Sequence, residues 1–194
     1  MVKFAVFASG SGTNFENIIH NLETGNIQNA KCVTLIVDKA QAKVIDRAKR
    51  LGIAYHVVLP KEFADKEAYE QAVLEILKKD QVELIILAGY MRIITHVLLD
   101  AYPKRIINLH PAYLPEFPGK QSILDAYEAK VTYSGVTVHY IDEGIDTGEI
   151  IRQEKVMIDP SWSLETLEEH IHALEYQLFP EVINLVCKQI EERR

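Results

Sequence analysis

Hydrophobic residues follow two different spacings in the first half of the chain. Compact apolar runs at residues 3–8, 33–37, 53–59, 84–88 and 105–109 predict strands, and the uninterrupted run at 84–88 is typical of a strand buried on both faces. Between these runs, apolar residues recur at helical spacing, which predicts helices beginning near Phe15, at 44–51, at 68–77 and near 95–101. Regular alternation of strands and helices favours a parallel sheet with helices on both faces.

The pattern changes after Gly119. Residues 122–129 predict a short helix, and residues 133–156 alternate in the manner of an antiparallel strand pair joined by a turn. Residues 163–193 predict a long helix with Ser163 as its N-cap, and we expect Pro180 to kink or interrupt it. The predicted fold is therefore α/β: a Rossmann-like, mostly parallel central sheet with helices on both faces, an antiparallel C-terminal addition and a long C-terminal helix.

Composition narrows the class of protein. The chain has 194 residues, of which 48% are hydrophobic and 25% charged, and this suits one globular domain. The net charge of -7 argues against a nucleic-acid-binding surface, and no apolar stretch is long enough to predict a membrane span. Cys32 and Cys187 lack a CxxC partner, which indicates reduced, buried cysteines of a cytoplasmic protein.

Three loops follow predicted strands at their carboxyl ends. They are SGSGTN at 9–14, GYMRII at 89–94 and NLHPAYLP at 108–115. Because ligands of open parallel sheets bind beyond the carboxyl ends of the strands, we expect these three loops to face one crevice.

The loop at 9–14 is suited to an anion. Glycine allows close approach of the backbone, and the helix that follows offers free N–H groups at its N-terminus. The loop lacks the Gly-Lys-Ser/Thr of a P-loop, and Phe15 stands where a dinucleotide fingerprint has its third glycine. We favour the phosphate of a mononucleotide-like substrate on Gly12, Thr13 and Asn14 over a dinucleotide site or a ligand-free turn.

The strand ending at 109 opens into a loop that carries polar groups. Side chains alternate along a strand, so Asn108 and His110 point to one side and Leu109 to the other. An amide and an imidazole on one side can act together on a ligand, although a strand-end cap would use the same residues. In the later turn DEGIDTG, a surface turn by default, the carboxylate of Asp146 would favour a charged imidazolium if it reached His110.

Other polar residues receive structural interpretations. Arg92 is either a ligand contact or a solvated loop charge, and His139 suits packing or a structural hydrogen bond. His172 and Glu175 share one face of the last helix, where a solvated face is the usual explanation. The sequence has no HExxH or other metal-ligand cluster, so we assign no metal, and it has no G-x-S-x-G of a serine hydrolase.

Taken together, SGSGTN, ILAGYMRII, INLHPAYLPEFPG and SGVTVHYIDEGIDTGEII resemble the folate-dependent formyltransferases, over residues 3 to about 180. The resemblance is strongest to the members that act on glycinamide ribonucleotide in purine biosynthesis. It implies one formyltransferase domain, with a nucleotide-binding half at about 1–100 and a catalytic and folate-binding half at about 101–194. It also implies (6R)-10-formyltetrahydrofolate as co-substrate, small-molecule partners only, and a chain that is able to form a homodimer.

The resemblance also implies roles for individual residues. Asn108, His110 and Asp146 match the catalytic trio. The ribonucleotide is implied to bind Gly12, Thr13, Asn14, His172 and Glu175. The folate is implied to bind Lys66, Met91, Arg92, Ile93, Ile94, Asn108, Asp142, Glu143, Gly144, Ile145 and Asp146. Two positions depart from the family pattern: Gln121 stands where relatives often carry histidine, and Lys66 where they often carry arginine.

Two other classes of function stay open from the sequence. A hydrolase on the same scaffold would release formate from formyltetrahydrofolate, but such hydrolases usually bear an extra N-terminal domain. A non-enzymatic nucleotide-binding module would leave Asn108, His110 and Asp146 without a task. A transferase acting on initiator tRNA would usually add a basic C-terminal domain, which we do not expect in this acidic chain.

Overall fold

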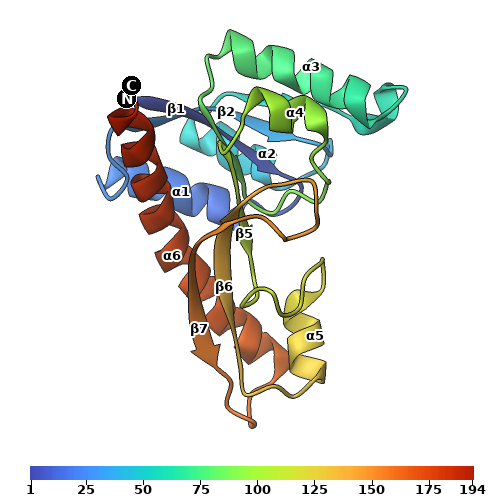
Figure 1. Ribbon diagram of the computed structural model, residues 1–194, viewed down its shortest axis with the longest axis vertical. Helices are drawn as coiled ribbons and strands as arrows, with labels where there is room; N and C mark the ends of the chain where they lie inside the picture. Colours follow the sequence, from blue (N-terminus) through green and yellow to red (C-terminus); the bar gives the residue numbers. More distant parts are fainter.

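The computed structural model describes residues 1–194 and contains one sheet of seven strands in the order β3-β2-β1-β4-β5-β6-β7 (Figure 1). The first five strands are parallel, and β6 and β7 are antiparallel to their neighbours. The strands are β1 (Val2–Ala8), β2 (Ala30–Val37), β3 (Tyr55–Val57), β4 (Leu84–Leu87), β5 (Ile106–His110), β6 (Tyr133–Tyr140) and β7 (Ile150–Met157). The prediction of a mostly parallel sheet with an antiparallel addition is confirmed.

Six α-helices and one short 3-10 helix connect the strands. They are α1 (Thr13–Glu23), α2 (Val44–Leu51), the 3-10 helix η1 (Pro60–Glu62), α3 (Lys66–Lys79), α4 (His96–Ala101), α5 (Ser122–Glu128) and α6 (Leu164–Glu192). Every predicted helix is present. The strand predicted at 53–59 is shorter than expected, because it is an edge strand that pairs with β2 at only three positions. No helix has the length and apolarity that crossing a membrane would require.

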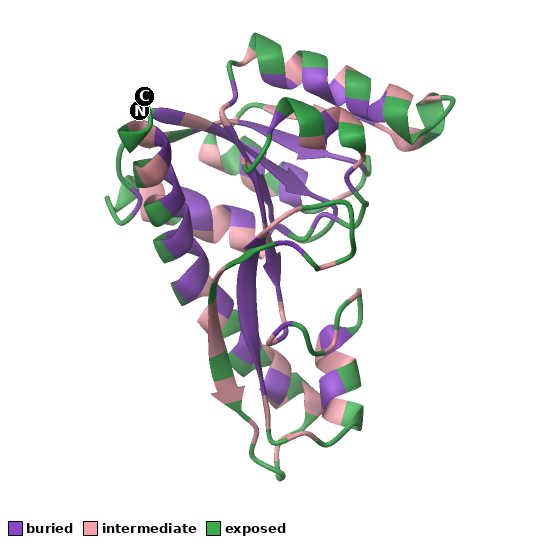
Figure 2. Ribbon diagram, viewed as in Figure 1, coloured by how far each residue is buried: buried purple, intermediate pink, exposed green.

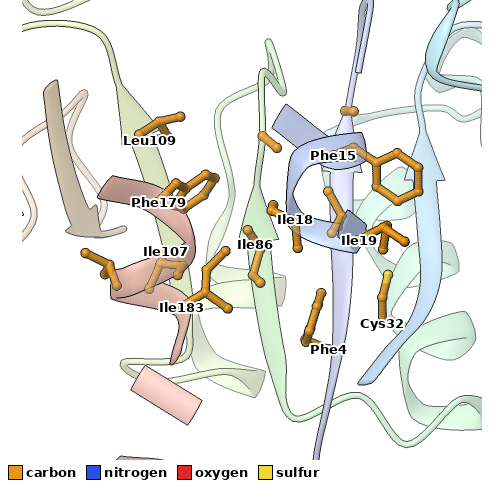
Figure 3. Close-up of a cluster of buried hydrophobic side chains, with 14 of the residues drawn as sticks. Phe4, Phe15, Ile18, Ile19, Cys32, Ile86, Ile107, Leu109, Phe179 and Ile183 are labelled. Carbon is orange, nitrogen blue, oxygen red and sulfur yellow. The ribbon is translucent and has the colours of Figure 1, made fainter. Parts of the chain in front are cut away.

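Two hydrophobic clusters cover the two faces of the sheet. Side chains of β1 alternate between them: Phe4 and Val6 pack towards α1, α2 and α6, whereas Ala5 and Phe7 pack towards α3 and α4. Figure 2 shows the buried stripe of each helix turned towards the sheet, and Figure 3 shows Phe4, Phe15 and Phe179 in the larger cluster. The prediction that helices cover both faces is therefore confirmed.

The long helix α6 is continuous from Leu164 to Glu192, so the prediction that Pro180 interrupts it is wrong, whereas a kink at Pro180 stays a prediction. Proline has no N–H and leaves the carbonyl of the residue four positions earlier, Tyr176, without its helical donor. The side chain of Asn17 on α1 supplies that donor, with its Nδ2 2.9 Å from the Tyr176 oxygen. Packing of α1 on α6 thus satisfies the group that the proline frees.

The direction of strand order reverses between β1 and β4, which lie side by side although β2 and β3 separate them in sequence. The loops that follow these two strands are bonded to each other. The Ser9 N–H donates to the Gly89 carbonyl at 3.1 Å, and the Met91 N–H donates to the Ser9 hydroxyl at 3.0 Å. A reversal of this kind opens a crevice at the carboxyl ends of the strands, where α/β proteins bind ligands.

Candidate active site

A cavity of about 390 Å³ occupies this crevice, within the range of small-molecule sites. All three predicted loops line it, as does the turn between β6 and β7. Two predicted residues do not: Glu143, and Lys66, which is exposed at the start of α3. The predicted residues that line the cavity are Gly12, Thr13, Asn14, Met91, Arg92, Ile93, Ile94, Asn108, His110, Asp142, Gly144, Ile145, Asp146, His172 and Glu175.

Asn108 is held by a histidine on the neighbouring strand. The register of β5 and β6 pairs Asn108 with His139, and the Asn108 Nδ2 lies 3.2 Å from the His139 Nε2. His139 Nδ1 donates to the Tyr140 carbonyl at 2.8 Å, so in the neutral ring Nε2 is the acceptor and receives the amide N–H. Burial lowers the pKa of His139, which favours this neutral form. One amide hydrogen of Asn108 is left for a ligand.

His110 is buried, and its two ring nitrogens face different partners. Nε2 lies 2.9 Å from the Phe117 carbonyl and donates to it, because a carbonyl only accepts. Nδ1 lies 3.5 Å from the Asp146 Oδ2, close enough for charge attraction but long for a hydrogen bond. Nδ1 is therefore the ring nitrogen that remains available to a reacting group.

Asp146 joins the loop after β5 to the turn before β7. Its Oδ2 accepts the Gly119 N–H at 2.8 Å, and its Oδ1 lies 3.7 Å from the His139 Nε2. The carboxylate therefore faces both buried imidazoles, and its side chain is only 13% exposed. The predicted approach of Asp146 to His110 is present in the structure.

The turn that carries Asp146 is fixed by its own residues. Asp142 Oδ1 accepts the Gly144 N–H at 2.9 Å and the Thr147 hydroxyl at 2.7 Å. A Cβ at Gly148 would lie 1.7 Å from the Tyr140 carbonyl oxygen, so only glycine fits there. The pattern D-x-G-x-D-T-G is thus a folded unit whose first aspartate builds the turn and whose second reaches the cavity.

The opposite end of the cavity is formed by α1 and α6. Gly12 is the N-cap of α1 with φ 77°, and it has no side-chain acceptor to occupy the free N–H groups of the first helical turn. A Cβ on Gly12 would lie 2.3 Å from Val44 Cγ2, so the position needs glycine for space as well as for conformation. Uncapped N–H groups at a helix N-terminus are suited to bind an anion.

His172 and Glu175 border this end; the interpretation as a solvated face holds for His172, which is exposed, but is wrong for Glu175. Glu175 is 4% exposed, because its carboxylate accepts from Asn14 Nδ2 at 3.1 Å and from His172 Nδ1 at 2.9 Å. The hydrogen bond from Glu175 raises the pKa of His172, although burial opposes it. An imidazole with a raised pKa and a helix N-terminus thus line the same cavity.

Apolar side chains are exposed between the two ends. Met91, Ile93 and Ile145 are 50%, 54% and 58% exposed, and all three line the cavity. Exposed apolar side chains that gather at a cavity indicate a partly apolar ligand. Arg92 is neither free nor simply solvated, since its Nε donates to the buried Asp38 Oδ2 at 2.8 Å.

The sequence patterns did not identify His139 or Asp38 as parts of the site. His139 contacts Asn108 only through the register of two strands, and Asp38 contacts Arg92 across three strands of the sheet. The sequence signal that could have identified His139 was a single histidine within an apolar strand. The signal for Asp38 was an aspartate directly after an apolar strand. No group of three or more His, Cys, Asp or Glu side chains is arranged to hold a metal ion.

Comparison with known proteins identifies the family. The family model described as formyl transferase matches residues 2–183. The chain is 50% identical to phosphoribosylglycinamide formyltransferase of Bacillus subtilis (strain 168) over 183 residues, which are 94% of this chain and 93% of that protein. It is 39% identical to the protein of the same name from Haemophilus influenzae over 94% of this chain and 86% of that one.

A solved structure agrees in fold. Glycinamide ribonucleotide transformylase 1 from Geobacillus kaustophilus superposes with a TM-score of 0.94 at 47% identity, over 96% of this chain and 99% of that chain. Sequence and fold therefore agree over nearly the whole length. The chain belongs to the formyl transferase family, whose members use formyltetrahydrofolate as co-substrate.

Proposed function

We propose that this protein transfers the formyl group of 10-formyltetrahydrofolate to the amine of N1-(5-phospho-D-ribosyl)glycinamide in de novo purine biosynthesis. The products are formylglycinamide ribonucleotide and tetrahydrofolate. The observation that carries the proposal is the meeting of Asn108, His110 and Asp146 at one end of a cavity whose other end is suited to a phosphate. The names of the similar proteins support the same reaction.

Asn108 and His110 are proposed to bind the formyl oxygen. Attack of an amine on a formyl carbon places negative charge on that oxygen in a tetrahedral intermediate. The free amide hydrogen of Asn108 and a protonated His110 Nδ1 would donate to it. Because His139 and the Phe117 carbonyl already hold the two side chains, the donors need little rearrangement as charge develops.

Asp146 is proposed to have two tasks. It lies 3.5 Å from His110 Nδ1, where its negative charge would stabilise positive charge on the ring while the ring donates to the formyl oxygen. The amine must also lose a proton. The carboxylate can accept it directly or through one water and return it to N10 of the folate as the bond between that nitrogen and the formyl carbon breaks. The 3.5 Å between His110 Nδ1 and Asp146 Oδ2 leaves both groups accessible to a reactant.

The remaining cavity residues are proposed to hold the substrates. The phosphate would bind the N–H groups at Gly12, Thr13 and Asn14, with His172 and Glu175 on the far side of the ribonucleotide. The folate ring would bind between residues 91–94 and 142–146, against the exposed Met91, Ile93 and Ile145. We leave Lys66 and Glu143 out of this assignment, because neither lines the cavity.

The proposal treats residues 1–194 as one formyltransferase domain, with a nucleotide-binding half at about 1–100 and a catalytic half at about 101–194. The folate segment at 91–94 lies near the boundary between the two halves. Residues of both halves line the one cavity to which this segment belongs. Both substrates are small molecules, and neither nucleic acid nor a membrane takes part in the reaction.

A direct absorbance assay tests the reaction. Purified protein is mixed with 10-formyltetrahydrofolate, with and without the ribonucleotide, and the loss of formylfolate is followed. We expect turnover only when the ribonucleotide is present. Equal turnover without it would identify a hydrolase of the same scaffold, and no turnover in either mixture would favour a binding module.

A further inference from the structure

The segment at 91–94, to which the folate ring is assigned, makes few hydrogen bonds of its own. The backbone N–H and carbonyl groups of Arg92, Ile93 and Ile94 have no partner within the protein, and all three residues line the cavity. A backbone of this kind presents its free groups to a ligand in a fixed direction only if the residues on either side of it are held. The groups that hold the two ends of the segment therefore bear on folate binding.

Two consecutive residues of α3 bind the residues that flank this segment. The Tyr69 hydroxyl lies 2.9 Å from the hydroxyl of Tyr90, which directly precedes residues 91–94. The carboxylate of Glu70 accepts hydrogen bonds from Thr95, which directly follows them. Helix α3 packs against α4 (Figure 1), so one helix holds both ends of the segment.

Glu70 is a buried carboxylate whose hydrogen-bond partners are neutral. The residue is 3% exposed, and its Oε1 accepts the Thr95 N–H at 2.7 Å. Its Oε2 accepts the Thr95 hydroxyl at 2.7 Å and the Leu98 N–H at 3.3 Å. Burial of a carboxylate is costly unless hydrogen bonds compensate for the lost water. The three donors therefore fix Glu70, and Glu70 in turn fixes the point where the folate segment ends.

These bonds replace a capping box, the motif in which a helix closes its own N-terminus. Thr95 is the N-cap of α4, and its hydroxyl accepts the Val97 N–H at 3.3 Å. In a capping box, a Glu or Gln three residues after the N-cap accepts the N-cap N–H, but that position is Leu98 here. Glu70 of α3 takes the Thr95 N–H instead. The start of α4 is thus positioned by a neighbouring helix and not by its own sequence.

We propose that Glu70 is a positioning residue for folate binding, with Tyr69 as its counterpart at the other end of the segment. The inference rests on the proposed function and deepens it, because it names the groups that hold the folate segment in place. Neither side chain lines the cavity, so both act through residues 91–94 without touching the ligand. Loss of Glu70 should weaken folate binding and spare the ribonucleotide, whose proposed site lies at α1 and α6.

The competing explanation is that Glu70 serves only the packing of α3 on α4. The two explanations differ in what a variant should change. A purely structural role would lower the temperature of thermal unfolding and leave the affinities of the folded protein for both substrates alike. A positioning role requires a selective loss of affinity for the folate in protein that is still folded.

The test measures equilibrium dissociation constants of tetrahydrofolate and of the ribonucleotide by calorimetry. Tetrahydrofolate carries the ring but no formyl group, so it binds without reacting. In Glu70→Gln one acceptor oxygen becomes an NH₂ group, so at least one of the donors at Thr95 and Leu98 loses its acceptor. We expect the Kd of tetrahydrofolate to rise roughly tenfold and that of the ribonucleotide to stay within about twofold. Glu75→Gln is the matched control and should change neither Kd, since Glu75 is exposed on α3 and lies outside the cavity.

A second pair of variants tests the same bond from its other side and serves if Glu70→Gln fails to fold. Thr95→Val removes the hydroxyl that donates to Glu70, whereas Thr95→Ser keeps it. The valine variant should bind tetrahydrofolate several-fold more weakly than the wild type, and the serine variant should match the wild type. An unchanged Kd of tetrahydrofolate in a folded Glu70→Gln or Thr95→Val protein would overturn the positioning role, as would an equal loss of affinity for both ligands.

The outcome is separable from that of the proposed function. A wild type that binds tetrahydrofolate but never turns over formylfolate would refute the reaction, and a selective loss of binding in Glu70→Gln would still support the positioning role. Normal turnover with unchanged folate binding in Glu70→Gln would refute the positioning role only. A wild type that does not bind tetrahydrofolate would refute both.

Discussion

The two ends of the cavity are assembled in different ways. At the reacting end, Asn108 and His139 are partners in adjacent strands. Asp146 reaches from a turn to within 3.5 Å of the His110 ring and 3.7 Å of the His139 ring. At the anion end, α1 and α6 are joined by side-chain hydrogen bonds of about ordinary length, including the one from Asn14 to Glu175. Longer contacts leave room for a reactant, whereas closed hydrogen bonds fix a binding surface.

This difference between the two ends predicts which kinetic constant a variant at each end should change. Changes at the reacting end should act on kcat, because the groups there are proposed to meet charge that develops only in the transition state. Changes at the anion end should act on the KM of the ribonucleotide, because those groups would meet a phosphate that does not react. A variant at the reacting end that changed only the KM of the ribonucleotide, or one at the anion end that changed only kcat, would show that the two ends are not separate in function.

The largest effect is expected from Asp146→Asn. The amide can still accept the Gly119 N–H but carries no negative charge and cannot take a proton, so kcat should fall by roughly 100- to 10,000-fold. The KM values of both substrates should stay within about threefold of the wild-type values, since the contacts that bind the unreacted substrates are unchanged. Steady-state kinetics with each substrate varied in turn gives both quantities. Wild-type kcat in this variant would remove Asp146 from the mechanism.

His139→Leu should have the next largest effect. It leaves the Asn108 amide without its buried acceptor, at a cost of ~1–3 kcal/mol, and so should lower kcat by roughly 10- to 100-fold. His139→Gln, which can still accept a hydrogen bond, is the matched control and should recover part of the loss. If both variants lose the same activity and the same stability in thermal unfolding, His139 serves packing alone.

Glu175→Gln should raise the KM of the ribonucleotide by roughly tenfold with little change in the folate KM, because it removes the charge that holds His172 and Asn14. The wild type should also show pH dependence. Glu175 raises the pKa of His172 above its ordinary 6.5, so the imidazolium is present below that raised pKa and is lost as pH rises through it. The ribonucleotide KM should therefore increase with pH over that interval.

The control for this pH dependence is His172→Gln, which keeps a donor but cannot titrate. Its ribonucleotide KM should be flatter with pH between about 6 and 8, an interval that begins near the ordinary histidine pKa and extends above it. An equally steep rise in this variant would assign the pH dependence to another group, such as the phosphate itself.

The smallest effect concerns the joint between α1 and α6. Asn17→Ala removes the donor to the Tyr176 carbonyl and should destabilise the fold by ~1 kcal/mol. In a Pro180→Ala background the helix supplies its own N–H to that carbonyl, so Asn17→Ala should then cost less. Denaturant unfolding of the four proteins in this cycle measures the coupling. Equal costs in both backgrounds would mean that Asn17 does not compensate for the proline.

The sequence predicted the parts of the molecule that depend on local periodicity. Alternation placed Asn108 and His110 on one side of a strand, and helical spacing located every helix. The sequence alone did not predict contacts that depend on the register of two strands or on the packing of two helices. His139 meets Asn108 because of how β5 and β6 pair, and Glu175 is buried because α6 packs on α1. The interruption expected at Pro180 was wrong for the same reason, since the compensating donor lies on another helix.

The resemblance to a family supplied most of the remaining site residues, and its weakest assignments were those without a local signal. Lys66 carries the charge expected near a folate, but the start of α3 lies outside the cavity. Contact of Lys66 with the folate therefore stays a prediction of the resemblance.

The most direct test of the account is a crystal structure of this protein with the ribonucleotide and a formylfolate analogue that cannot react. The account predicts the phosphate on residues 12–14, and the amine within about 3.5 Å of the carbon that replaces the formyl carbon. That carbon should lie beside Asn108 Nδ2 and His110 Nδ1. A phosphate bound elsewhere, or a reacting carbon out of reach of both side chains, would contradict it.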